Sequence, residues 1–163
     1  MDREYILQVA VVFAAATSLV GYLHAASVES TITATILTPI SISKQADLAF
    51  GEVYPDGTVT GTVTVDHSGG RTFQGGVAAG SVPGSAGSFT VTGELGSTYS
   101  LTIPASVNLL GPGAEMLVNL NHNSSGSLSL GADTFKIGGV LNVGANQSSG
   151  AYSATFVVTV NYN

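Results

Sequence analysis

The sequence has no cysteine, no tryptophan and few charged residues. Without cysteine, neither a disulfide framework nor thiolate chemistry is available. Charged residues make up only 9% of the 163, and four Lys and Arg stand against ten Asp and Glu, so the net charge is −6. Four cations are too few to line a nucleic-acid groove, and an acidic surface repels phosphate. We therefore predict that nucleic acid is not a partner.

Motifs for catalysis or metal binding are also lacking. Asp66-His67-Ser68 has the residue types of a hydrolase triad, but a triad converges from separate segments, and no G-x-S-x-G turn is present. A turn capped by Asp66, with Arg71 pairing to it, is the simpler interpretation. His67 and His122 lack the spacing of zinc ligands. We predict no enzyme, no cofactor and no metal, with a calcium site among scattered carboxylates left as an open alternative.

The N-terminus supplies a leader. "MDREYILQVAVVFAAATSLVGYLHAAS" places Arg3 before an apolar stretch at residues 6–23 and small residues at Ala25-Ala26-Ser27. This order predicts a helical signal peptide over residues 1–26, cleaved near Ala25 or Ala26. A retained membrane anchor of similar length is the alternative. Cleavage would take the four basic residues to three and the ten acidic residues to eight, so the mature chain stays acidic.

The rest of the chain has an all-β composition. Thr and Val favour strands, and glycine (all but Gly21 of the 21 in the sequence) with Ser, Asn and Pro supplies turns such as "YPDG", "HSGG" and "NHNSSG". Short runs separated by such turns predict an immunoglobulin-like β-sandwich over residues 27–163. After the first segment, the expected strands are residues 47–50, 57–66, 71–79, 87–92, 98–103, 115–122, 127–130, 134–143 and 151–162.

Both ends of the mature chain are long alternating segments. The first places Val28, Ile32, Ala34 and Ile36 on one face, continuing to Ile40 and Ile42, with Glu29 and threonines on the other face. The last places its apolar residues on one face in the same way: Tyr152, Ala154, Phe156, Val158, Val160 and Tyr162. Neither segment carries the charge that normally protects an exposed strand edge, apart from Glu29 at the start of the first. We predict that both strands are buried in the mature state, by pairing within the chain or between chains.

The C-terminus resembles that of pilins assembled by periplasmic chaperones and outer-membrane ushers. Those proteins carry a penultimate tyrosine and a glycine fourteen positions from the end, matched here by Tyr162 and Gly150. The resemblance implies that the last strand, with Gly150, Tyr152, Phe156, Val158, Val160 and Tyr162, is held first by a chaperone. It also implies that residues 27–37 of the next subunit then fill an open groove as a donor strand, through Val28, Ile32, Ala34 and Ile36.

Four blocks resemble a second family, of secreted bacterial β-domains of unknown function likened to common-pilus (Mat/ECP-like) major subunits. They are "ATILTPISISKQADLAFG", "VTVDHSGGRTFQGGV", "GSFTVTGELGSTYSLTIP" and "FKIGGVLNVGANQSSGAYSATFVVTVNYN". His67 stands where that family's pattern has proline. The resemblance implies export through the periplasm to the cell surface or a fimbria, and assembly with further copies of the same chain.

Two functions are left open by these observations. The first is a non-enzymatic filament subunit joined head to tail by strand addition, with a chaperone and an usher as further partners. The second is a monomeric adhesion module whose loops "GSVPGSAG" and "LNHNSSGS" bind a sugar or a host ligand, with the N-terminal strand folded back on its own chain.

Overall fold

The computed structural model describes residues 25–163. The predicted leader helix falls on residues 1–24, outside the described part. The chain divides into two units, Met1–Thr35 and Ile36–Asn163. Residues 25–35 of the first unit are exposed and have no regular secondary structure. Among the described residues, no helix has the length and apolar content to span a membrane.

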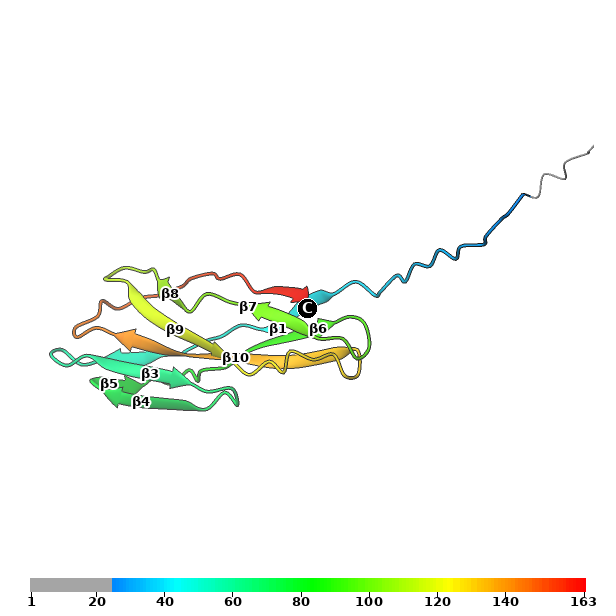
Figure 1. The fold of residues 1–163 in the computed structure, drawn as a ribbon. Coiled ribbons are helices and arrows are strands. Elements are labelled where there is room, and N and C mark those ends of the chain that lie inside the picture. The colour runs from blue at the N-terminus through cyan, green and yellow to red at the C-terminus, as the bar shows by residue number, and fades with distance from the viewer. Residues whose placement is uncertain (1–24) are drawn as a thin grey trace, which may run out of the picture. The chain divides into compact units, whose positions relative to one another are not determined.

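The second unit is all-β, as predicted (Figure 1). Eleven strands are described: β1 (Ser41–Ala46), β2 (Val53–Pro55), β3 (Gly61–Val65), β4 (Arg71–Gly75), β5 (Val77–Ala79), β6 (Gly87–Thr92), β7 (Tyr99–Thr102), β8 (Ser106–Leu109), β9 (Met116–His122), β10 (Ala132–Val143) and β11 (Thr159–Tyr162). One seven-stranded sheet runs β1-β6-β10-β3-β4, with β9 paired to β10 and β8 to β9. The pairs β11-β7 and β2-β5 form two smaller sheets.

Strand β10 organises the large sheet. Its first half pairs with β6, its second half with β3, and its middle with β9. Residues that alternate along β10 therefore face a shared interior, and Phe135, Ile137, Leu141 and Val143 are all at most 2% exposed. Such burial contributes about 1.5–3 kcal/mol for each large apolar side chain. The result is a sandwich-like packing of curled sheets.

The interior consists of two apolar clusters. The first contains Phe50, Val63, Val65, Met116, Val118, Leu141 and Val143. The second contains Phe89, Val91, Tyr99, Leu128, Phe135 and Ile137, with the Phe89 and Phe135 rings stacked at a centroid distance of 5.6 Å. The C-terminal segment packs on both, since Tyr152 contacts the first cluster and Phe156, Val158, Val160 and Tyr162 contact the second.

Several predicted strands agree with the structure, whereas residues 57–66 form a strand, β3, only over Gly61–Val65. Residues 87–92 are confirmed as β6, and β7, β9 and β10 lie within two residues of their predicted bounds. Residues 71–79 are divided into β4 and β5 at Gly76. The prediction is wrong for residues 47–50 and 127–130, which contain only the single bridges Ala49–Ser85 and Thr98–Ser127. It also missed the short strands β2 and β8.

The two terminal strands were predicted too long. Residues 28–40 belong to no strand, so the first ladder begins only at Ser41. Between 151 and 158 only Ser153 forms a bridge, and β11 covers four residues. The physical reason is that a strand needs a neighbouring backbone, which these two segments lack among residues 25–163.

A buried tyrosine makes the fold sensitive to high pH. Tyr99 is 2% exposed and its hydroxyl donates to Asp133 Oδ2 at 2.6 Å. Burial and then this bond raise the pKa of Tyr99 to about 12. Because an unfolded tyrosine loses its proton near pH 10, the folded chain holds a proton that the unfolded chain releases between about pH 10 and 12. The free energy of unfolding therefore falls as pH rises through that window.

We expect Tyr99→Phe to remove this part of the pH dependence. The measurement is the urea midpoint of unfolding from pH 8 to 12, with Tyr54→Phe as the control because Tyr54 is 63% exposed. The unmodified chain and the control should lose stability above pH 10, while the Tyr99 variant should be less stable at pH 8 and flatter above it. A variant with the parental slope would contradict the assignment.

Candidate functional site

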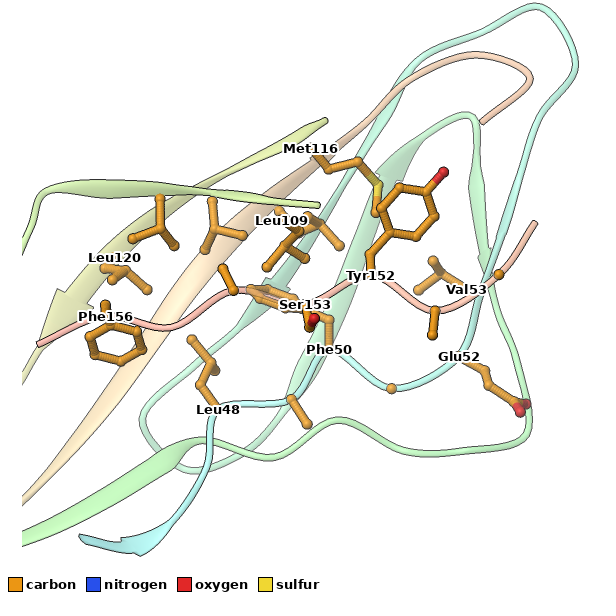
Figure 2. Close-up of a pocket in the computed structure, with 18 of the residues that line it drawn as sticks. Leu48, Phe50, Glu52, Val53, Leu109, Met116, Leu120, Tyr152, Ser153 and Phe156 are labelled. Atoms are coloured by element: carbon orange, nitrogen blue, oxygen red, sulfur yellow. The ribbon is translucent and has the colours of Figure 1, made fainter. Parts of the chain in front are cut away.

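An open apolar groove lies between two segments that are far apart in the sequence. Residues 48–54 form one wall, residues 150–154 and 156 form the other, and the first core cluster forms the floor (Figure 2). The cavity has a volume of about 800 Å³. The residues of the floor are Val107, Leu109, Met116, Val118, Leu120 and Leu141. Any apolar chain placed in this groove would extend the core.

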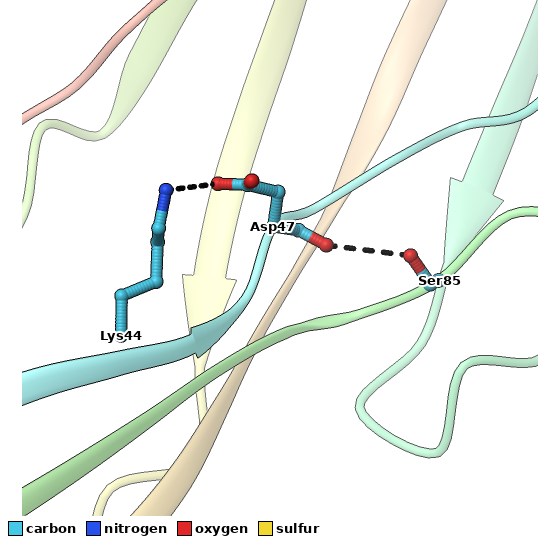
Figure 3. Close-up of polar contacts among 3 residues, drawn as sticks. All are labelled: Lys44, Asp47 and Ser85. Carbon is cyan, nitrogen blue, oxygen red and sulfur yellow. Dashed lines mark hydrogen bonds and ion pairs between the residues drawn. The ribbon is translucent and has the colours of Figure 1, made fainter.

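The first wall follows directly from strand β1. The Lys44 ammonium and the Asp47 carboxylate form an ion pair of 2.7 Å at this turn, and Ser85 Oγ donates to the Asp47 carbonyl at 3.3 Å (Figure 3). Ala49 and Ser85 then exchange two backbone hydrogen bonds of 2.8 and 2.9 Å. An exposed ion pair contributes at most about 1 kcal/mol, so the backbone bonds fix this turn.

Arg71 holds the first wall in place. Its Nη1 donates to the carbonyls of Phe50, Glu52 and Val82 at 2.8, 3.0 and 3.1 Å. Gly51 between them has φ +72°, a conformation that glycine adopts readily. The predicted pairing of Arg71 with Asp66 is therefore wrong, because the guanidinium donates to three backbone carbonyls instead.

The groove contains one charged residue, and its charge is engaged elsewhere. Glu52 Oε2 accepts hydrogen bonds from Ser81 Oγ at 2.7 Å and from the Ser81 and Val82 N–H groups. These bonds, first that from the Ser81 hydroxyl, lower the pKa of Glu52. Figure 2 shows the Glu52 carboxylate directed away from the apolar side chains of the cavity. The groove therefore suits an uncharged, apolar ligand.

The second wall is fixed at its N-terminal end. The Tyr152 hydroxyl accepts from Gly113 N and Gln147 Nε2 and donates to the Ser148 carbonyl, all at 2.9–3.0 Å. Gly150 has φ +138°, and a side chain there would collide with Pro112. Ser153 and Leu110 exchange two backbone bonds of 2.9 Å. Tyr152 thus closes one end of the groove beside Met116 (Figure 2).

Beyond Ser153 the second wall has no ladder partner. Residues 154–158 belong to no strand and no bridge, and pairing resumes only where β11 meets β7. Ala154 lines the cavity and is exposed, although its alternating neighbours Tyr152 and Phe156 are partly buried. An extended wall with unpaired backbone beside an apolar floor has the features of a sheet that accepts a further strand.

The predicted C-terminal residues divide into two groups. Gly150, Tyr152 and Phe156 line the groove, whereas Val158, Val160 and Tyr162 pack on the second core cluster outside it. The predicted donor residues are exposed: Val28 is 92%, Ile32 94% and Ile36 96% accessible, and Ala34 is also exposed. Sequence reasoning missed the first wall and the floor, for which the alternation of Val107 and Leu109 was the available signal.

Tyr162 anchors the start of the second unit. Its hydroxyl donates to the Thr38 carbonyl and accepts from Glu94 N, both at 2.6 Å. Glu94 Oε2 in turn accepts from Thr38 N at 2.8 Å, and hydrogen bonding from Thr38 lowers the pKa of Glu94. Both backbone polar groups of Thr38 are therefore held by the body of the domain.

The other residues considered from the sequence have structural contacts. Asp66 Oδ1 accepts from Ser68 N, Ser68 Oγ and Gly70 N at 2.6–2.8 Å, which confirms the capped turn. These bonds, first that from the Ser68 hydroxyl, lower the pKa of Asp66. In the two loops considered for ligand binding, Ser81 is bonded to Glu52 and Ser125 to Asp133. Polar groups of both loops are thus engaged with their own chain.

The second unit is thus an all-β, sandwich-like domain with one open apolar groove described. Residues 40–162 match the model of a family described as Domain of unknown function (DUF4402), and the chain belongs to that family. The matched region includes both walls of the groove but not residues 28–36. No curated protein and no solved structure matches the chain.

Proposed function

We propose that this chain is a structural subunit of a bacterial surface filament, joined by strand addition between copies. Residues 27–37 of one copy fill the groove of the next and complete an immunoglobulin-like sandwich. The observation that carries the proposal is that the same chain has both an open apolar groove and an exposed, alternating apolar segment. The contact is heterologous, so it builds an open fibre and not a closed dimer.

The chemistry of the segment suits the groove. Val28, Ile32 and Ile36 share one face, and each contributes about 1.5–3 kcal/mol if it becomes fully buried. The backbone of the donor would pair with the second wall, residues 150–156, of which residues 154–156 have no ladder partner, adding hydrogen bonds of roughly 0.5–1.5 kcal/mol each. Ordering the segment costs on the order of 1–2 kcal/mol per residue. Burial of Val28, Ile32 and Ile36 therefore decides whether the donor strand stays bound in the groove.

Export follows from the same proposal. A chain that exposes a long apolar segment and an open groove aggregates unless a partner covers them before assembly. We propose the leader as the export signal, a periplasmic chaperone as the first occupant of the groove, and an outer-membrane usher as the site of exchange. The mature location is the cell surface or the fimbria.

Two substitutions on opposite faces of the segment test the proposal. We expect Ile32→Asp to abolish filaments, because it places a charge in an apolar groove, while Thr33→Asp leaves them, because Thr33 lies on the other face. Negative-stain microscopy of the surface fraction, with N-terminal sequencing, is the measurement. Filaments that persist in the Ile32 variant, or that vanish equally in both, would refute donation by this face.

A further inference from the structure

The end of the domain where Thr38 is anchored exposes three leucines. Leu37 is 52% exposed, Leu95 67% and Leu130 88%. They are brought together by short bonds: Thr38 N to Glu94 Oε2 beside Leu37 and Leu95, and Gly93 N to the Gly131 carbonyl at 3.0 Å beside Leu130. We call Leu37, Leu95 and Leu130 the root end.

These leucines differ from the single exposed apolar residues of an ordinary surface, because Leu95 and Leu130 lie on two loops that the fold ties together and Leu37 adjoins the Thr38 anchor. Gly96 N donates to the Leu128 carbonyl at 2.8 Å, and Leu128 N donates to the Ser97 carbonyl at 2.8 Å. The loops that carry Leu95 and Leu130 are thus held beside each other. Gathered apolar surface of this kind marks an interaction site.

The opposite end of the C-terminal segment also exposes apolar side chains. Tyr54 is 63% exposed and lines the groove, and Leu110 is 59% exposed and bridges Ser153. From Ser153 to Tyr162 the chain is extended, so the two ends are roughly 30 Å apart at about 3.3 Å per residue. In Figure 1 the C-terminus and strand β5, which pairs with β2, lie at opposite ends of the domain. We call Tyr54 and Leu110 the groove end.

The anchoring of Thr38 leaves almost no slack between donor and domain. A neighbour that binds Ile36 is two residue steps from the fixed Thr38, a span of at most about 7 Å when extended. The neighbour's surface must therefore lie against the root end. This argument rests on the proposed function.

We propose that the root end of one copy packs on the groove end of the next, with Leu95 and Leu130 against Tyr54 and Leu110. The partner is a second copy of this chain. A donor that runs antiparallel to residues 150–156 brings Leu37 to Gly150 and Tyr54, which places the two apolar ends face to face. The interface makes the joint rigid, because the two domains are held by the strand and by their end surfaces together.

Crosslinking tests this interface, and the absence of native cysteine makes it unambiguous. Four double variants combine Leu95→Cys or Leu130→Cys with Tyr54→Cys or Leu110→Cys in the full chain. We expect filaments treated with a short bismaleimide to give a covalent ladder after denaturation in at least one pair. The matched control replaces the groove-end partner by Asn119→Cys, an exposed residue on β9, and should give no ladder.

The outcomes separate this inference from the proposed function. If filaments form and none of the four pairs gives a ladder above that of the Asn119 control, the interface is refuted while strand addition stands. If the unmodified chain forms no filaments, the proposed function fails and the interface fails with it. If Ile32→Asp removes both filaments and ladders, the contact depends on the donor strand, as inferred.

Discussion

We expect deletion of residues 27–37 to abolish filaments and to leave a domain that binds the deleted segment as a free peptide. Both walls and the floor of the groove lie within residues 48–156, so the deletion removes the donor and keeps the acceptor. The anchor at Thr38 also remains. The domain is expected to be insoluble or to need its chaperone, because the groove then has no occupant in any copy.

The free peptide should restore stability to this variant. A ligand that binds only the folded state stabilises it by RT ln(1 + [L]/Kd), about 2.7 kcal/mol at a hundredfold excess over Kd. The variant would be purified with its chaperone or after refolding. Its Tm should therefore rise by several degrees when residues 27–37 are added as a peptide. The control peptide carries Ile32→Asp and Ile36→Asp, and should shift nothing.

Two results would oppose this expectation. Filaments formed by the deletion variant would show that another segment is the donor. Equal shifts with the parental and the aspartate peptides would show that the groove does not select the apolar face. A stable monomer whose Tm is unchanged by either peptide would favour the alternative of a monomeric binding module.

Period-two patterns predicted faces well. In the C-terminal segment Tyr152, Phe156, Val158, Val160 and Tyr162 are partly buried and their neighbours are exposed, as the alternation indicated, whereas Ala154 of the same predicted face is exposed. Alternation reports the environment of side chains, and that environment is set by which face meets the core. It was therefore reliable at this end of the chain, where one face packs on the two core clusters.

The same patterns could not predict hydrogen-bond partners. Residues 28–40 and 154–158 alternate as regularly as β6, yet they have no ladder, because alternation carries no information on the neighbouring backbone. The unpaired stretch of the C-terminal segment is the feature that makes a groove. Its position therefore came from the structure.

The first wall was hidden for a further reason. Arg71 reaches the Phe50 carbonyl across 21 residues, and Ser85, which bonds to Ala49, follows it by 36 residues in the sequence. Neither of these long-range contacts can be predicted from the local strand or turn propensity of the residues. The neighbouring carboxylate of Asp66 suggested a short-range ion pair for Arg71, whereas its guanidinium donates to the carbonyls of Phe50, Glu52 and Val82.

Filling the groove from within should stop a subunit from accepting a donor while leaving its ability to donate. Ala154 is exposed, lines the cavity and lies between the inward-facing Tyr152 and Phe156, so Ala154→Trp places a large ring where the donor strand must lie. Thr155→Trp adds the same ring on the opposite, exposed face and is the matched control. In the background that lacks residues 27–37, the Ala154 substitution should weaken peptide binding on the order of 100-fold, equivalent to about 2.7 kcal/mol.

Mixing two variants distinguishes the ability to accept a donor strand from the ability to donate one. The full chain with Ala154→Trp can donate but not accept, and the deletion variant can accept but not donate, so together they should form a pair that does not grow. Native mass spectrometry would detect one copy of each, and microscopy would show no filaments. Filaments formed by the Ala154 variant alone, or peptide binding weakened equally by Thr155→Trp, would mean that the strand enters elsewhere. A growing mixture would contradict a single acceptor groove, because each joint in an open heterologous fibre consumes one donor and one groove.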